Sequence, residues 1–562
     1  MPNYDHLDRE TLIRLLQRRD AERQLGLVWE RDEIEADQAL NNDFVALTLD
    51  PALSHGDAPW HNLIIEGDNF DALRALRASY KGAIRCIYID PPYNTGNKDF
   101  VYNDRFIDKT HRFRHSLWLE FMYQRLLLAK ELLADDGVIF VSIDDNEVFR
   151  LGMLMDRVFG LSGKLAAFTW QTDGNFDNQA KIKISHEYVL AYSKNLDLFP
   201  MPAVIDPNVP DTSKLFRAEI RNTIVKNGPK NPVSEILLPA GFPASFEQGT
   251  INARDDNRWP KIKADIRVAD GRLVSDSVVK SGWANKALCE KFIANGFRPI
   301  KDTKGQDTRF ELTLSGAIEN VKIRSASHVV SVLRNMGNTQ ADSAYLSDMG
   351  IQFTYPKPVS LIKYLLSIID DKDTMVLDFF AGSGTTGEAV SKLNAEDGGR
   401  RKFILVSSTE ATEEQPDKNL CRDVCAERVR RVLGGYTNAK GQAVDGLGGG
   451  FAYLRARRVP THRMTQKLDH AEIWNALQLL HARPLTPWPG SGFAADQAED
   501  GTAFAYLSDA YPASRTRMDT WLQARGAQAA TLYSWSPERY RTADSPHDWR
   551  VIPQHLRERF GR

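Results

Sequence analysis

The clearest chemical signal in this 562-residue chain is the tetrad Asp90-Pro91-Pro92-Tyr93, which directly follows an apolar run. Residues 84–89 predict a short core strand, because they are apolar and rich in β-branched side chains. Two successive prolines prevent helix and expose carbonyls without competing amide donors. An acid beside a bare carbonyl can accept both hydrogens of an amino group, and Tyr93 offers a flat face for a base. A plain Pro-Pro turn with a capping acid would also explain the tetrad alone.

A second motif, far downstream, has the form of a nucleotide-cofactor loop. Residues 375–379 predict an apolar strand, Gly382-Ser383-Gly384 a tight turn, and residues 388–393 a helix. Glycines permit positive φ and close backbone approach, and the start of a helix supplies free amide donors. The motif is not a phosphate loop, because no Lys-Ser or Lys-Thr follows, and it lacks full GxGxxG spacing. Taken alone, such a turn is more often structural than a binding site.

Together, the two motifs resemble those of DNA amino-methyltransferases that use S-adenosylmethionine. That family's base-binding motif is D/N/S-PP-Y and its cofactor loop is F-x-G-x-G, and both are intact here. The base-binding motif comes first, as in the permuted β group, which includes many adenine-N6 enzymes. The resemblance spans about residues 20 to 435. Three strings look more narrowly like the modification (Mod) subunits of Type III restriction-modification systems: Gly26–Glu30, Ile65–Asn69 and Asp90–Gly96.

The resemblance implies an α/β fold with a Rossmann-like methyltransferase sheet in permuted motif order. It assigns catalysis to Asp90, Pro91, Pro92 and Tyr93. The residues expected to bind the cofactor are Asp68, Lys357, Asp378, Phe380, Gly382, Gly384 and Glu410. Asp68 could instead only cap the next helix, and Lys357 could steady the catalytic acid rather than meet the cofactor carboxylate. Glu410 follows a predicted strand and suits the ribose hydroxyls, as acids do in dinucleotide folds, although a neighbouring loop residue could take this role.

Alternating strands and helices predict a parallel α/β sheet. One long helix is expected over residues 115–135, ended by Gly137 and followed by a strand at 138–143. The expected domains are an N-terminal helical segment, two catalytic halves separated by a target-recognition domain, and, after the glycine-rich residues 446–450, a small C-terminal α/β module. Their ranges are 1–60, 61–197, 198–350, 351–440 and 451–562, with 61–197 and 351–440 as the catalytic halves.

Composition is ordinary for a soluble globular protein, with 42% hydrophobic residues and a net charge of -2. No stretch approaches the roughly 18 apolar residues of a membrane span, and the amino end has no signal-peptide core, so we expect a cytoplasmic protein. Cys421 and Cys425 lie one helical turn apart without a nearby His. Buried or incidental thiols explain them better than metal ligands, and no metal is expected.

The expected reaction is methyl transfer to N6 of adenine in duplex DNA, with the base flipped out of the stack. Acceptors at Asp90 and the Pro91 carbonyl would favour a pyramidal, attacking nitrogen and stabilise its developing charge. Cations interleaved with aromatics over residues 201–350 suit DNA contact, although a solvated surface is the alternative. Cytosine N4, an RNA or protein amide, and a catalytically vestigial specificity subunit stay open. The Type III resemblance further implies a homodimer and a separate helicase-nuclease restriction subunit.

Overall fold

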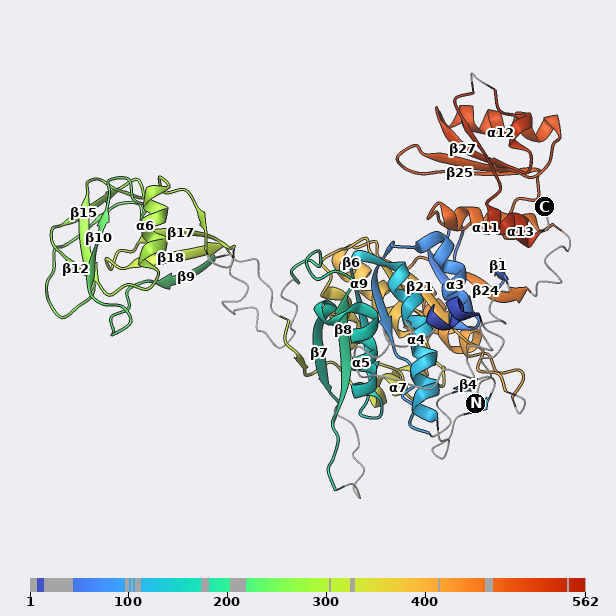
Figure 1. Ribbon diagram of the computed structural model, residues 1–562, viewed down its shortest axis with the longest axis horizontal. Helices are drawn as coiled ribbons and strands as arrows, with labels where there is room; N and C mark the ends of the chain where they lie inside the picture. Colours follow the sequence, from blue (N-terminus) through green and yellow to red (C-terminus); the bar gives the residue numbers. More distant parts are fainter. Residues whose placement is uncertain are drawn as a thin grey trace. The chain divides into compact units, whose positions relative to one another are not determined.

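The computed structural model divides the chain into two compact units, residues 201–329 and the remainder. Both are shown in Figure 1, where colour follows the sequence. The structure describes residues 8–14, 44–96, 101–102, 105–106, 113–172, 181–202, 219–302, 305–323, 329–412, 415–459, 468–542 and 545–560. The string Gly26–Glu30, which contributed to the resemblance, lies outside the described residues.

A ten-stranded mixed sheet forms the centre of the larger unit, in the order β1-β24-β2-β21-β20-β3-β6-β8-β7-β19. Its strands are β1 (Phe44–Leu49), β2 (Asn62–Glu66), β3 (Ile84–Ile89), β6 (Leu133–Ile143), β7 (Lys164–Gln171), β8 (His186–Ser193), β19 (Val332–Leu333), β20 (Met375–Asp378), β21 (Lys402–Ser407) and β24 (Phe451–Val459). The run from β24 to β6 is parallel, whereas β8 runs antiparallel to β6. The expected α/β class with a Rossmann-like sheet is confirmed.

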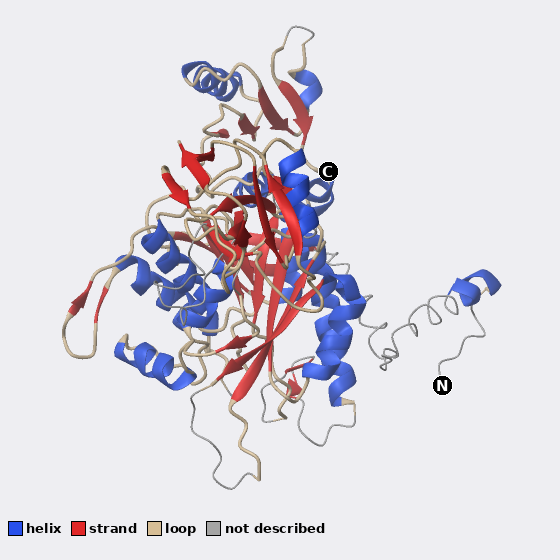
Figure 2. Cartoon of the chain, turned by 90° about the vertical axis from the view of Figure 1, so that its left-hand side faces the viewer, coloured by secondary structure: helices blue, strands red, loops and turns tan. Residues whose placement is uncertain are grey.

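Helices cover both faces of this sheet (Figure 2), as its apolar, two-sided burial requires. One layer consists of α3 (Asn69–Tyr80), α4 (Arg114–Leu132) and α5 (Val148–Phe159), with α4 packed against both of the others. The other contains α8 (Val359–Ser367), α9 (Thr385–Asp397) and α10 (Glu427–Gly434), with α10 preceded by a π-helical turn, Cys421–Ala426. Smaller elements of this unit are β4 (Val101–Tyr102), β5 (Arg105–Phe106), a 3-10 turn (Leu161–Gly163), α7 (Thr339–Asp348), β22 (Tyr436–Thr437) and β23 (Ala443–Val444).

The register of two neighbouring strands brings the two sequence motifs together. Strand β20 pairs in parallel with β3, with Val376 opposite Cys86 and Leu377 opposite Ile87. The carboxyl ends of parallel strands lie at one edge of a sheet, which is where ligands bind in open α/β folds. The tetrad after β3 and the glycine loop after β20 therefore share this edge.

Three expectations about boundaries need correction. The segment expected to be helical, 1–60, contains strand β1, because its alternating apolar residues pair antiparallel with β24 from Phe44 opposite Val459 onward. Strand β24 itself lies between β1 and β2, so the expected C-terminal module, 451–562, begins too early. Helix α4 ends at Leu132, since Leu133 adopts an extended backbone and pairs with Ile84, and Gly137 lies inside β6.

The glycine-rich stretch 446–450 packs closely against the backbone at Leu433 and His55. A Cβ on Gly446 would lie 2.2 Å from the Leu433 carbonyl oxygen, and one on Gly450 would lie 2.3 Å from that of His55. Side chains at these two positions would therefore clash with backbone. The stretch leads into β24 and is packed against neighbouring backbone, so it is not a free linker.

The smaller unit, 201–329, contains three antiparallel sheets around one hydrophobic core that includes Phe242, Phe292 and Phe310. Its elements are β9 (Glu219–Thr223), β10 (Ser234–Leu238), β11 (Gly249–Ile251), β12 (Lys261–Ile262), β13 (Ile266–Ala269), β14 (Arg272–Leu273), β15 (Ser277–Ser281), α6 (Lys286–Ala294), β16 (Ile300–Lys301), β17 (Asp307–Leu312) and β18 (Ile318–Ile323). The expected segment 198–350 extends too far, because β19 joins the edge of the central sheet beside β7.

The C-terminal residues build a small α/β layer with its own two apolar clusters. Its four-stranded sheet has the order β25-β26-β27-β28, in which only the β25 and β26 pair is antiparallel. The elements are α11 (His470–Leu480), β25 (Phe493–Gln497), β26 (Ala503–Leu507), α12 (Pro512–Ala524), β27 (Ala530–Ser534), a 3-10 turn (Pro537–Arg539), β28 (Asp548–Val551) and α13 (Gln554–Arg559).

Candidate active site

The carboxyl edge of the sheet gathers acidic residues from three strands. Asp90 directly follows β3, and Asp378 is the last residue of β20. Because β8 runs antiparallel to β6, its first residues, including Glu187, lie at this same edge. Glu187 belongs to neither sequence motif, yet the fold places it against the tetrad.

Asp90 has one paired carboxylate oxygen and one without a partner among the described residues. Its Oδ2 lies 2.9 Å from Lys357 Nζ. Its Oδ1 is buried and has no hydrogen-bond partner among the described residues. Burial raises the pKa of Asp90, and the Lys357 ammonium opposes this only in part. For Lys357, burial alone would lower the pKa, but the Asp90 and Glu187 carboxylates outweigh it and leave that pKa above its ordinary value. Lys357 is thus a buried cation that holds one carboxylate oxygen of Asp90.

Tyr93 is fixed at both its hydroxyl and its ring. The hydroxyl donates to Glu187 Oε2 at 2.8 Å, and Lys357 Nζ lies 4.8 Å from the ring centre. The Pro92 carbonyl accepts the indole N–H of Trp118 at 2.7 Å, which anchors the proline turn to helix α4. The tetrad is therefore preorganised by contacts from β8, α4 and the loop before α8.

Asn94 closes the turn after the tetrad. It adopts the left-handed conformation, with φ of 56°, and its side-chain amide donates to Glu147 Oε1 at 2.6 Å. The same carboxylate oxygen contacts His115 Nδ1. Asn is among the few residues other than Gly that tolerate this backbone region. These contacts fix where the chain leaves the site.

Glycine occupies positions 382 and 384 of the loop for different physical reasons. Gly384 has φ of +78°, and a Cβ there would lie 2.8 Å from the Cys425 carbonyl oxygen. Gly382 has φ of +49°, but its Cβ would meet no atom of the described residues nearer than 3.8 Å. Packing within the protein thus requires Gly384, whereas at Gly382 a Cβ would make only ordinary van der Waals contacts, and the positive φ is the reason for glycine there.

Asp378 holds the loop's entrance. Its Oδ1 accepts the Phe380 backbone N–H at 3.0 Å, and its Oδ2 accepts the Thr386 hydroxyl at 2.5 Å. Burial raises the pKa of Asp378 to about 7. Both contacts are internal to the loop, so the side chain shapes the loop itself.

A buried ion pair that sequence reasoning missed supports the loop from beneath. Arg428 Nε lies 2.6 Å from Glu388 Oε2, and both side chains are fully buried. Arg428 Nη1 also donates to the hydroxyls of Ser383 at 3.0 Å and Thr385 at 2.7 Å. The glycine loop is therefore tied to α10, and no local sequence pattern links Arg428 to it.

The remaining predicted residues have other visible contacts. Asp68 caps α3 by accepting the Phe70 and Asp71 backbone N–H groups at 2.9 and 3.2 Å, and its Oδ2 lies 3.2 Å from Arg125. The Phe380 ring packs against the Phe121 ring at 5.9 Å between centres. Glu410 follows β21 with φ of +52°, and its exposed carboxylate lies 2.9 Å from Lys418 Nζ. These contacts are all within the protein, so the role of each of these residues in cofactor binding stays a prediction.

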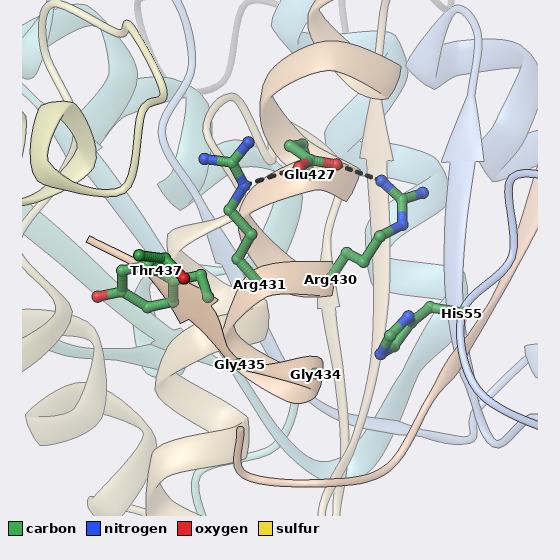
Figure 3. A pocket seen from close by; sticks show the side chains of 8 residues that line it. His55, Glu427, Arg430, Arg431, Gly434, Gly435 and Thr437 are labelled. Atoms are coloured by element: carbon green, nitrogen blue, oxygen red, sulfur yellow. Dashed lines mark hydrogen bonds and ion pairs between the residues drawn. The ribbon is translucent and has the colours of Figure 1, made fainter. Parts of the chain in front are cut away.

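A separate cavity of about 510 Å³ contains none of the predicted site residues. Figure 3 shows Arg430 and Arg431 on opposite sides of Glu427, with His55 nearby. Both Glu427 oxygens are engaged, by Arg430 and by Arg431 at 2.7 Å, so the carboxylate is fully paired and the three side chains together keep one positive charge.

The four cysteines are buried with free thiols. Within the described part of the chain, no group of His, Cys, Asp and Glu side chains is arranged to hold a metal ion. A membrane-spanning helix is also absent from those residues, because none combines the necessary length and hydrophobicity.

Comparison with known proteins identifies the family. A family model described as DNA methylase, N6_N4_Mtase, matches residues 84–415. The Mod subunit of the Type III restriction-modification enzyme StyLTI, from Salmonella typhimurium, is 31% identical over 506 residues, which is 83% of this chain and 71% of that protein. The chain belongs to the DNA methylases of the Type III Mod type. The expected DNA methyltransferase activity and S-adenosylmethionine cofactor are confirmed by this membership.

Other similar proteins match over different shares of their own length. The EcoPI Mod subunit of Escherichia phage P1 is 33% identical over 384 residues, which is 62% of this chain and 58% of that protein. Among solved structures, PvuII DNA methyltransferase, described as cytosine-N4-specific, has 13% identity and a TM-score of 0.30 over 67% of this chain and 93% of that one. A DNA modification methylase of Thermus thermophilus in complex with S-adenosyl-L-methionine has 12% identity and a TM-score of 0.28, over 65% and 96%.

Proposed function

We propose that this DNA methylase methylates N6 of adenine in duplex DNA as the modification and specificity subunit of a restriction-modification system. One observation carries the proposal: Asp90 Oδ1 is a buried carboxylate oxygen without a partner among the described residues, beside an aromatic ring. A buried acceptor without a hydrogen bond is unfavourable in free energy. An exocyclic amino group on a flipped base would supply the missing donor.

The described residues also fit the cofactor. No atom of the described residues lies closer than 3.8 Å to the position of a Gly382 Cβ, which allows the close approach of a ligand, and the start of α9 supplies backbone amide donors beside it. When bound, S-adenosylmethionine supplies an electrophilic methyl group. We assign its binding to Asp68, Asp378, Phe380, Gly382, Gly384 and Glu410, whereas the contacts of Lys357 favour its role in steadying Asp90.

Each tetrad residue has a distinct task in this mechanism. The ring of Tyr93 offers the stacking surface on the face away from Lys357. Asp90 Oδ1 accepts one amino hydrogen, which orients the nitrogen lone pair toward the methyl donor. The Pro91 carbonyl accepts the other, and Pro92 fixes the turn. These preorganised acceptors stabilise the positive charge that develops on N6. A flipped base is required because N6 is inaccessible within the stack.

The test is identification of the methylated nucleoside. Purified protein is incubated with methyl-labelled S-adenosylmethionine and unmethylated bacterial DNA, and the DNA is hydrolysed to nucleosides. We expect label in N6-methyladenosine. Label in N4-methylcytosine would replace the proposed target, and no incorporation into DNA would contradict the function. Sequencing of the modified DNA then gives the recognition site.

Sequence recognition is proposed for the unit 201–329. Lys226, Lys230 and Lys280 are exposed and form no ion pair among its described residues. Lys280 lies in β15, and Lys226 and Lys230 lie in the segment between β9 and β10, which is joined to the end of β15 because the Lys226 backbone N–H donates to the Gly282 carbonyl. By contrast, Arg254 donates to the carbonyls of Pro260 and Ser315, which makes it structural. Free cations on one surface are suited to DNA phosphates.

We propose three further associations for the whole protein: duplex DNA, a second copy of the chain, and a separate restriction subunit. The second copy is supported by an apolar surface on α5, where the side chains of Phe149 and Met153, one turn apart, are 80% and 38% exposed. Such surfaces commonly mark interfaces. Sedimentation should show a dimer for wild type and a monomer for Phe149→Glu; a monomeric wild type would contradict the proposed homodimer.

The cytoplasm, where DNA is accessible, is the proposed location.

A further inference from the structure

Glu187 is the residue at this edge whose contacts the two motifs do not explain. It is the second residue of β8 and lies opposite Trp170 of β7, and its Oε2 accepts the Tyr93 hydroxyl at 2.8 Å. The same oxygen lies 3.5 Å from Lys357 Nζ, which itself lies 2.9 Å from Asp90. Glu187 therefore contacts both the base-stacking ring and the cation that holds the catalytic acid.

We propose that Glu187 is a positioning residue for methyl transfer, which keeps Asp90 Oδ1 free for the target amino group and fixes the ring of Tyr93 for stacking. The proposal rests on the proposed base-binding role of the tetrad. It assigns a function to a side chain on an antiparallel strand, outside the tetrad and the cofactor loop.

Lys357 is shared between two acids, Asp90 and Glu187. Its ammonium has three donor hydrogens and two acid partners, and only 10% of the side chain is exposed. A lysine with Asp90 as its sole partner would be free to engage both carboxylate oxygens. Attraction to Glu187 holds Nζ to one side, so that Oδ1 keeps its vacant acceptor position.

The net charge of the group also depends on Glu187. Asp90, Glu187 and Lys357 together carry one net negative charge at neutral pH when both acids are ionised. Positive charge develops on the target nitrogen as the methyl group is transferred, and a buried net negative group stabilises it. Without Glu187, the remaining pair is neutral and this stabilisation is lost.

The position of Tyr93 also depends on Glu187. A tyrosine ring whose hydroxyl is anchored is restricted in rotation and displacement, and Glu187 provides that anchor. A base that stacks on a fixed ring is held with its amino group toward Asp90. Positioning of this kind contributes through orientation of the reacting atoms.

The main test is Glu187→Gln, which keeps the side-chain size and an acceptor for Tyr93 but removes the charge. Single-turnover methylation of a duplex carrying the mapped recognition site should fall tenfold or more, with cofactor and DNA affinity within twofold of wild type. Glu396→Gln is the matched control, because it removes the same charge from an exposed ion pair with Lys363. It should methylate like wild type.

A pH profile separates this role from a merely structural one. The charged or titratable groups facing Asp90 are Lys357, Glu187, Tyr93, Tyr88 and Asp378. The Glu187 carboxylate raises the pKa of Asp90. Its removal should therefore move the acid limb of the single-turnover rate to lower pH. A profile that falls in amplitude without moving, or a rate within threefold of wild type, overturns the proposal.

Tyr93→Phe supplies a second test. This test remains valid even if Glu187→Gln has a lower melting temperature than wild type. It removes only the anchored hydroxyl. With 2-aminopurine at the target position and no cofactor, the short-lived, stacked fluorescence component should decrease, and the rate should fall threefold or more. An unchanged stacked component together with an unchanged rate overturns the proposal. Adenine methylation by wild type stands in either case, so the function is tested separately.

Discussion

Replacing Asp90 by alanine removes the buried carboxylate oxygen that lacks a partner among the described residues. Removal of one preorganised hydrogen-bonding group from an active site costs about 3 kcal/mol, on the order of a hundredfold in rate. Lys357 keeps Glu187 as a partner at 3.5 Å, so no buried cation is left wholly unpaired. We therefore expect methylation to fall by at least about a hundredfold while cofactor affinity is preserved.

The rate is measured under single-turnover conditions with labelled S-adenosylmethionine, and cofactor affinity by calorimetry. Asp136→Ala is the matched control, since Asp136 also pairs with a cation, Arg85 at 2.7 Å, but is more exposed. Its rate should equal that of wild type. An Asp90→Ala rate within tenfold of wild type would refute the role of Asp90 as the essential acceptor.

Four further outcomes follow from the same contacts. Gly382→Val should weaken S-adenosylmethionine binding in calorimetry, because its side chain would occupy the position where the cofactor is proposed to approach the loop; unchanged affinity in a folded variant would make the loop only a turn. Arg428→Met should lower the free energy of unfolding in urea by about 1–3 kcal/mol, because Glu388 loses its buried guanidinium partner but keeps Lys392 at 2.7 Å and the Tyr345 hydroxyl at 2.8 Å, and an unchanged free energy of unfolding would argue against a tightly coupled pair. Burial raises the pKa of Asp378 to about 7, so stability should fall as pH rises from about 4 to 7; Asp378→Asn should flatten this dependence, and an unchanged curve would contradict it. Lys226→Ala with Lys280→Ala should reduce the slope of log DNA affinity against log salt by about 0.9 per lost phosphate contact; an unaltered slope would remove this surface from DNA binding.

The base-binding and cofactor motifs could be located from sequence because each is a local string. Their strands are short, apolar and followed by prolines or glycines, and these signals need no knowledge of distant residues. The structure adds their adjacency through the pairing of β3 with β20. It also distinguishes the two glycines, because only packing against Cys425 explains Gly384.

Other features depend on contacts that sequence periodicity does not encode. Glu187 joins the site because β8 runs antiparallel to β6, and the local sequence does not specify that pairing. Strand β1 was missed because its partner, β24, lies near the other end of the chain. Arg428 supports the glycine loop from a helix whose alternating charges resemble an ordinary solvated surface.

The most direct measurement is the distance between Asp90 Oδ1 and the target nitrogen in a structure with duplex DNA and a non-reactive cofactor analogue. We predict a flipped adenine whose N6 lies within hydrogen-bond distance of Oδ1, about 2.7–3.1 Å, with its ring on Tyr93. An adenine that remains stacked in the duplex, or that binds with N6 directed away from Asp90, would contradict the mechanism.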